Sequence, residues 1–167
     1  MKTLFTLLLA VTISTASFAQ TKDVVDIAIG SADHTTLVAA VKAADLVNTL
    51  KGSGPFTVFA PTNAAFDKLP EGTVANLLKP ENKDQLAKIL TYHVVSGNLD
   101  ASAVMAAIKA GKGKAVLTTV SGGKLTASID NGKVKLTDVN GNASYVTATD
   151  LKGSNGVIHV ISTVVLP

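Results

Sequence analysis

The chain has 167 residues and a formal net charge of +3, with 47% hydrophobic and 16% charged residues. This composition excludes an intrinsically disordered protein. The small charge, and the fact that all 15 basic residues are Lys, exclude an electrostatic binder of nucleic acid. The chain contains no Cys, so the domain has to be stable without disulfides.

The first 19 residues predict a secretory signal peptide of bacterial type. Lys2 precedes an apolar run at residues 4–13, and small residues at Ser17 and Ala19 form a cleavage site. Cleavage there makes Gln20 the first mature residue and leaves residues 20–167 as a single domain. The apolar run is too short to span the roughly 30 Å of a bilayer core, so we expect no membrane insertion after cleavage. The expected location is the periplasm or the medium.

The mature chain predicts mainly helices in its first half. Gly30 ends the first helix, and Asp33 or Thr35 is expected to cap the second. Thr62 or Asn63 is expected to cap the helix after Pro61. The expected helices lie at residues 24–29, 35–44, 46–50, 63–69, 74–78, 80–93 and 101–110, and a buried strand covers residues 56–60.

From residue 114 onward the hydrophobic period changes to two, which is typical of strands. The sequence Asp130-Asn131-Gly132 predicts a tight hairpin between two of them. The expected strands cover residues 116–120, 125–129, 134–136, 145–149 and 157–161. Helices followed by strands indicate the α+β class.

Basic residues are concentrated in the second half of the chain. Residues 101–167 contain seven Lys and three acidic residues, whereas residues 20–100 have a net charge of −2. One interpretation is a basic patch for an anionic partner such as a surface polysaccharide. The other, which the sequence favours, is a solvated sheet face whose lysines discourage edge-to-edge pairing. The excess is mostly Lys109, Lys112, Lys114, Lys124, Lys133 and Lys135.

Candidate catalytic or metal-binding patterns are absent from the sequence. The three His residues do not have metal-ligand spacing, and no phosphate loop, dinucleotide fingerprint or nucleophile elbow occurs. We therefore predict no cofactor, no metal and no catalysis. His93 and His159 are interpreted as hydrogen-bonded histidines of the core, and Tyr92 as a ring packed at the core boundary. A hydrolase that uses His93 or His159 is a further hypothesis.

Three segments together resemble the fasciclin (FAS1) domain family. They are residues 56–66 (FTVFAPTNAAF), residues 90–95 (LTYHVV) with a Tyr-His motif, and residues 155–161 (NGVIHVI) followed by 164–167 (VVLP). The resemblance extends from about Asp23 to Pro167, which is nearly the whole mature chain. It implies an α+β fold in which a wedge-like, twisted β-sandwich packs against several α-helices.

The same resemblance implies adhesion. Fasciclin domains bind matrix components, receptors or other cells. In animal members the Tyr-His region and an Asp-Ile pair are implicated in integrin binding. The matching residues are Tyr92 and His93, and Asp150 with Leu151. A second interpretation of Asp150 is a turn residue that closes the preceding strand. We expect a monomer whose partner is a surface or matrix protein or polysaccharide; the alternative is a soluble binder of a small molecule or polysaccharide in a cleft between helices and sheet.

Overall fold

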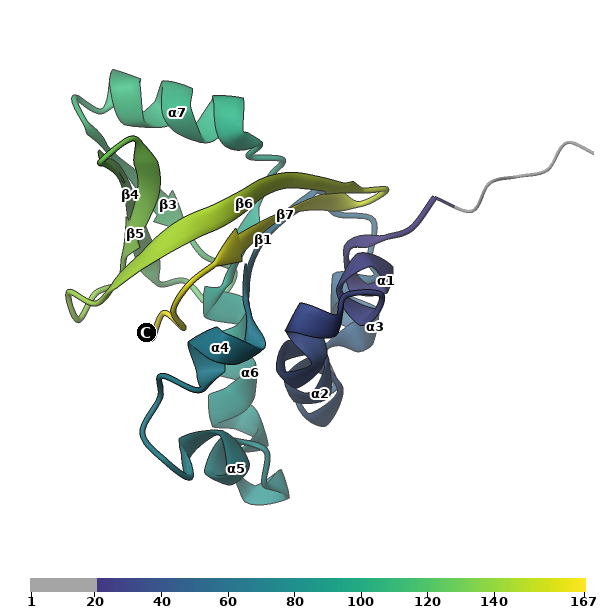
Figure 1. Cartoon of the computed structure of the whole chain (residues 1–167). Helices are drawn as coiled ribbons and strands as arrows, with labels where there is room; N and C mark the ends of the chain where they lie inside the picture. Colours follow the sequence, from purple (N-terminus) through teal and green to yellow (C-terminus); the bar gives the residue numbers. More distant parts are fainter. Residues whose placement is uncertain (1–20) are drawn as a thin grey trace, which may run out of the picture.

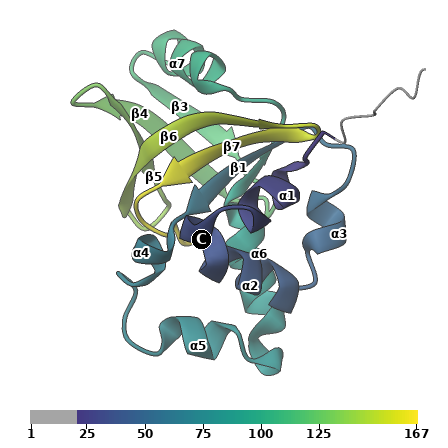
Figure 2. The same cartoon turned by 45° about the vertical axis from the view of Figure 1, so that its right-hand side comes forward.

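The computed structural model describes residues 21–167, so the predicted signal peptide at residues 1–19 lies outside the described residues. In this part of the chain, helices α1 to α6 lie on one side of a strongly bent sheet, and α7 lies on the other side (Figures 1 and 2). The predicted α+β class is confirmed.

The helices begin and end largely where local sequence signals place them. Asp23 and Asp26 form a capping box at the start of α1, and Asp100 caps α7 by accepting a hydrogen bond from the Ala103 N–H. The helical elements are α1 (Val24–Ile29), η1 (Ala32–His34), α2 (Thr35–Ala43), α3 (Val47–Leu50), α4 (Asn63–Phe66), α5 (Thr73–Leu77), η2 (Pro80–Asn82), α6 (Lys83–Tyr92) and α7 (Ala101–Ala110).

Seven strands form one sheet in the order β2-β1-β7-β6-β5-β4-β3. The neighbours β1 and β7 are parallel, with Phe56 opposite Gly156 and Pro61 opposite Ile161, and all other neighbours are antiparallel. The strands are β1 (Phe56–Pro61), β2 (Val94–Ser96), β3 (Lys114–Thr118), β4 (Lys124–Asp130), β5 (Lys133–Thr137), β6 (Ala143–Gly153) and β7 (Gly156–Ile161).

The sheet bends until its two ends meet and nearly closes a barrel. An antiparallel bridge joins Val95, at the β2 end, to Thr119 just after β3. The Val120 N–H also donates to the Val94 carbonyl at 2.8 Å. The wedge-like sandwich expected from the sequence is therefore one continuous sheet, because β6 is long enough to pair with both β5 and β7.

Two hydrophobic clusters lie on opposite faces of β1 and β7. One fills the space between helices α1 to α6 and the sheet, and it includes Ala60 of β1 and Ile158 of β7. The other fills the inside of the barrel, where Phe59 and Ile161 meet side chains of β3 to β6 and the inner face of α7. Successive side chains of a strand point to opposite faces of the sheet, so β1 and β7 each contribute residues to both clusters.

The expected cap of the second helix differs from the structure, whereas the cap of α4 is one of the two residues expected. The residue before α2 is His34, whose side chain makes no cap hydrogen bond, so neither Asp33 nor Thr35 is the cap of that helix. Thr62, rather than Asn63, caps α4. The Asn63 side chain instead joins α4 to the α2 region, because its Oδ1 accepts from the Thr36 N–H and its Nδ2 donates to the Ala32 carbonyl, both at 3.0 Å.

Candidate functional site

Tyr92 and His93 end α6 inside the molecule. The Tyr92 side chain is 0% exposed, and its hydroxyl donates a 2.6 Å hydrogen bond to the Lys124 carbonyl at the start of β4. Burial raises the pKa of Tyr92. The residue therefore ties the helical layer to the far side of the barrel, and the Gly123 backbone lies against its ring.

His93 is 2% exposed and uses both ring nitrogens. Its Nδ1 donates to the Ile89 carbonyl at 2.8 Å, and its Nε2 accepts from the Val165 N–H at 3.2 Å. Since a carbonyl can only accept, the proton lies on Nδ1 and the ring is neutral. Burial lowers the pKa of His93 to about 4. The interpretation of His93 as a hydrogen-bonded core histidine is confirmed.

His159 is a second buried histidine, on the barrel side of β7. Its Nε2 donates to the Leu99 carbonyl at 2.7 Å, and its Nδ1 faces the Asp150 N–H at 3.4 Å. The ring stacks on Phe59 with centroids 5.7 Å apart. These contacts confirm the structural interpretation of His159 and leave neither ring nitrogen free to act as a general base.

Asp150 and Leu151 lie at the surface, inside β6. Asp150 has a φ of 60°, at an irregularity in the pairing of β6 with β7. The strand continues to Gly153, so the interpretation of Asp150 as a turn residue that closes the strand is wrong. The Asp150 Oδ1 accepts a 2.8 Å hydrogen bond from the Ala101 N–H, at the first turn of α7. This contact between distant segments has no signal in the sequence.

The structure therefore does not bring the four sequence-predicted residues together at one surface. Tyr92 and His93 are enclosed by other side chains, whereas Asp150 and Leu151 are exposed. Every residue from 147 to 152 is exposed, and we call this stretch of β6 the β6 rim. Leu151 is the one large hydrophobic side chain exposed in it, at 39%.

A polar hollow lies beside the β6 rim, at the turn between β6 and β7. Its volume is about 200 Å³, and its polar lining includes Ser53, Asn98, Lys152 and Ser154. Lys152 forms no ion pair with any described residue. The rim and the hollow together offer an apolar side chain, a free ammonium group and several hydrogen-bonding groups within a few residues.

Asn155 fixes the floor of this region, and its role could not be inferred from the sequence. Its Oδ1 accepts from the Val24 N–H at 3.0 Å, while its Nδ2 donates to the carbonyls of Leu50 at 2.7 Å and Gly52 at 2.8 Å. Asn-Gly at residues 155–156 indicates a turn, which is present. The Asn-Gly pair does not indicate the three hydrogen-bond partners of the Asn155 side chain, which are all more than 100 residues away in the sequence.

A second hollow lies between α1, α2, α3 and the sheet, where the small-molecule alternative places a ligand. It is almost wholly apolar, with Lys42 as its one charged residue. Its cavity volume is about 40 Å³. Apolar cavities that hold a benzene ring measure about 150 Å³. In this conformation the hollow is therefore too small for an organic ligand.

Within residues 21–167 no group of three or more His, Asp or Glu side chains could hold a metal ion. Across the same residues no helix is long and apolar enough to cross a membrane. His34 is also buried; its Nδ1 pairs with the Ser31 hydroxyl at 2.8 Å, and its Nε2 has no partner in this part of the chain. Burial lowers the pKa of His34, and no pocket described above reaches its ring.

Comparison with known proteins gives consistent relatives. The family described as "Fasciclin domain" matches residues 32–167. Protein sll1483 of Synechocystis is 49% identical over 155 residues, covering 93% of this chain and 79% of that protein. Transforming growth factor-beta-induced protein ig-h3 of Sus scrofa is 38% identical over 144 residues, covering 86% of this chain and 19% of that protein.

A solved structure extends the comparison to the fold. The FAS1 domain pair of the insect cell adhesion molecule Fasciclin I superposes with a TM-score of 0.76 at 17% identity. The match covers 87% of this chain and 51% of that one. At this identity the similarity establishes the fold alone.

Proposed function

Because the chain belongs to the Fasciclin domain family, we propose that it is a non-catalytic interaction module that binds a protein or polysaccharide of a cell surface or extracellular matrix. The family match and the ig-h3 relative of Sus scrofa support an adhesion-type interaction module. The proposed module acts as a monomer and without a cofactor. The buried, hydrogen-bonded rings of His93 and His159 argue against the alternative hydrolase.

The single observation that carries the proposal is the exposed Leu151 on a firmly held strand. Leu151 lies opposite Ile158 of β7, which is buried in the helical cluster, and Lys152 lies opposite the buried Val157. Asp150, on the other side, is tied to α7. A surface that is already ordered loses little conformational entropy on binding, so few side chains are enough for useful affinity.

The chemistry of the β6 rim indicates what its partner presents. Leu151 can enter a shallow apolar pocket, and Lys152 can pair with a carboxylate that enters the polar hollow. We therefore propose Leu151 and Lys152 as the contact residues. Asp150 belongs to the same surface but acts mainly by positioning the rim against α7. Tyr92 and His93 act only by supporting the fold.

The test is attachment of cells or matrix extract to immobilised protein. The double variant Leu151→Ala and Lys152→Ala should weaken attachment about tenfold, which corresponds to about 1.4 kcal/mol. The matched control is Val139→Ala with Lys79→Ala, which also removes one exposed apolar and one basic side chain. Circular dichroism and melting temperature should be unchanged in both. Equal attachment by the double variant and the wild type would remove the rim from the site.

The proposed location is outside the cytoplasm, by cleavage of the signal at residues 1–19. Intact mass of exported protein should correspond to a chain that begins at Gln20. Full-length chain retained in the membrane fraction would contradict this part of the proposal.

A further inference from the structure

Five lysines gather at one end of the barrel. Lys109 is in the last turn of α7, Lys112 is in the turn that follows, and Lys114 begins β3. Lys133 and Lys135 begin β5, just after the hairpin. The turn after α7 and the β4–β5 hairpin lie at the same end of the barrel (Figures 1 and 2). We call these five residues the basic end.

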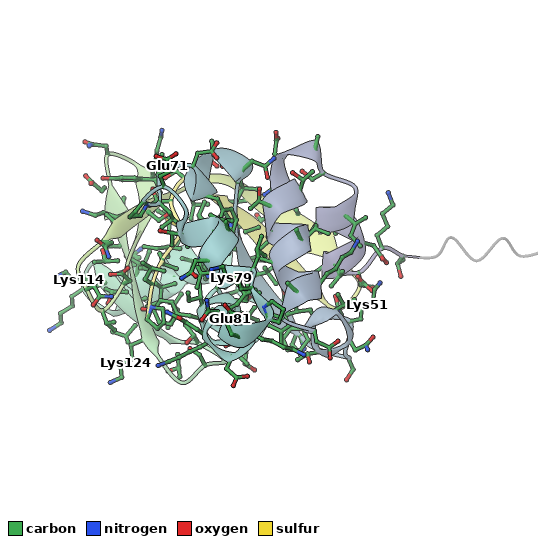
Figure 3. All side chains as sticks on the ribbon, turned by 90° about the horizontal axis from the view of Figure 1, so that it is seen from below. Lys51, Glu71, Lys79, Glu81, Lys114 and Lys124 are labelled. Carbon is green, nitrogen blue, oxygen red and sulfur yellow. The ribbon has the colours of Figure 1, made fainter. Side chains whose placement is uncertain are left out.

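The strand register places three of these lysines on one outward face. Lys114 is opposite Ser128 of β4, and Ser128 is opposite Lys135 of β5. Residues directly opposite each other point to the same face of a sheet, and neighbouring strands are about 4.8 Å apart, so the Cα atoms of Lys114 and Lys135 are about 10 Å apart. Lys133 lies two residues before Lys135 on the same strand, so its side chain points to the same face of the sheet. Lys114 projects away from Glu71, in the turn before α5, and from Glu81 of η2 (Figure 3).

One acidic residue, Asp130, shares this face, and its charge is already engaged. Asp130 lies opposite Lys133, and its Oδ2 accepts a 2.7 Å hydrogen bond from the Tyr145 hydroxyl. The same oxygen is 3.8 Å from the Lys135 Nζ. The other four lysines form no ion pair with any described residue. The basic end therefore keeps a strong local excess of positive charge.

The simplest structural explanation, protection of a sheet edge, does not account for all five lysines. Lysines protect exposed sheet edges from pairing with other chains. Here Lys135 lies on a strand paired on both sides, opposite Ser128 of β4 and Tyr145 of β6, so it protects no edge. Lys109 and Lys112 belong to no strand. Lys114 is on β3, the last strand of the sheet, and Lys133 precedes the residues of β5 that pair with β6, so edge protection accounts for these two lysines at most. Five like charges held close together repel one another, so their concentration at one end points to a partner of opposite charge.

We infer that the basic end is a binding site for an acidic polysaccharide, with uronate carboxylates paired to its lysines. The surrounding face supplies hydroxyl groups that match sugar hydroxyls, from Thr126, Ser128 and Thr137. Lys suits this partner because it acts as a mobile point charge, whereas nucleic-acid recognition draws on Arg forks and stacked aromatics. This chain has no Arg.

This inference goes beyond the proposed function and depends on a different surface. Asp150 contacts the first residue of α7, whereas Lys109 lies in its last turn. A ten-residue helix is about 15 Å long, so the β6 rim and the basic end lie at opposite ends of α7. Either surface can bind its partner without the other.

The test compares two triple variants that lose the same charge. The first, Lys109→Gln with Lys114→Gln and Lys133→Gln, should weaken binding to soluble polygalacturonate at least about tenfold. The control, Lys42→Gln with Lys79→Gln and Lys88→Gln, changes exposed lysines of the helical side and should stay within about twofold. Both variants should melt as the wild type does. Binding by the wild type should weaken with added salt, and neutral dextran should not bind.

Several outcomes would overturn the inference. Equal loss in both triple variants would mean that net charge, rather than the basic end, attracts the polymer. Tighter binding to duplex DNA or to anionic lipid vesicles than to polygalacturonate would assign the site to another class of partner. The Leu151→Ala variant should bind polygalacturonate like the wild type, so that failure at the β6 rim and failure at the basic end are distinguishable.

Discussion

At the scale of single residues, His93 links stability to pH. Its folded-state pKa of about 4 lies below the usual value of 6.5. The unfolded chain therefore binds a proton first as the pH falls, which favours unfolding. The stabilisation from neutral His93 is fully present above pH 6.5 and is lost as the pH falls toward 4.

We expect His93 to account for about 3 kcal/mol of the free energy of unfolding that is lost between pH 6.5 and 4. Urea unfolding at several pH values measures it, with His93→Gln as the comparison because Gln does not titrate. The variant should be less stable at neutral pH and should show a flatter pH dependence. Parallel curves for the two proteins would contradict the assignment.

Asn155 stabilises the fold through hydrogen bonds from its side chain to the backbone of distant segments. Removing its side chain leaves the Val24 N–H and the Leu50 and Gly52 carbonyls without their partner. Because buried unpaired groups are costly, Asn155→Ala should lower the free energy of unfolding by about 3 kcal/mol. Asn98→Ala, at an exposed residue of the same region, should change it by less than about 0.5 kcal/mol. Similar chemical-denaturation curves for the two variants would contradict the stabilising role of the Asn155 side chain.

At the scale of elements, α7 is held at its N-terminus by two carboxylates. Asp100 caps it locally, and Asp150 accepts from the Ala101 N–H across the fold. Both complement the positive end of the helix dipole. The attachment of α7 to β6 therefore depends on a residue from outside the helix.

Asp150→Ala should lower the free energy of unfolding by about 1 kcal/mol and speed hydrogen exchange at the Ala101 amide. Asp150→Asn keeps an acceptor oxygen and tolerates a positive φ, so its effect should be under about 0.5 kcal/mol. An equal loss of stability in both variants would show that the negative charge of Asp150, rather than its acceptor oxygen, stabilises the N-terminus of α7. No loss in either would remove the contact from the stabilising interactions.

At the scale of the whole molecule, the two hydrophobic clusters share β1 and β7. Phe59 and Ile161 belong to the barrel cluster, whereas Ala60 and Ile158 belong to the helical cluster. Loss of either cluster exposes one face of these same two strands. The two layers should therefore unfold together.

Calorimetry of residues 20–167 should show a single transition whose calorimetric and van't Hoff enthalpies agree. Reducing agent should leave it unchanged, because the chain has no Cys. Two resolved transitions would mean that the helical layer and the barrel fold as separate units, contrary to the predicted single domain.

The sequence predicted elements whose signals are local. The helix at Val24–Ile29, the capped helix at Ala101–Ala110 and the hairpin at Asp130-Asn131-Gly132 all depend on residues a few positions apart. The strand β2, of three residues, was missed because it is too short to show a period. β6 extends further than the predicted residues 145–149 because its second half pairs with β7, a contact with no local signal.

For the candidate site, the sequence by itself determined the family motifs, the lack of catalytic patterns and the excess of Lys in the second half. Only the tertiary structure decided that Tyr92 and His93 are buried, that Asp150 holds α7, and that Lys135 lies on a strand paired on both sides. The physical reason is distance along the chain. Caps, turns and periodicity depend on neighbouring residues, whereas burial and strand order depend on residues that meet only after the sheet has closed.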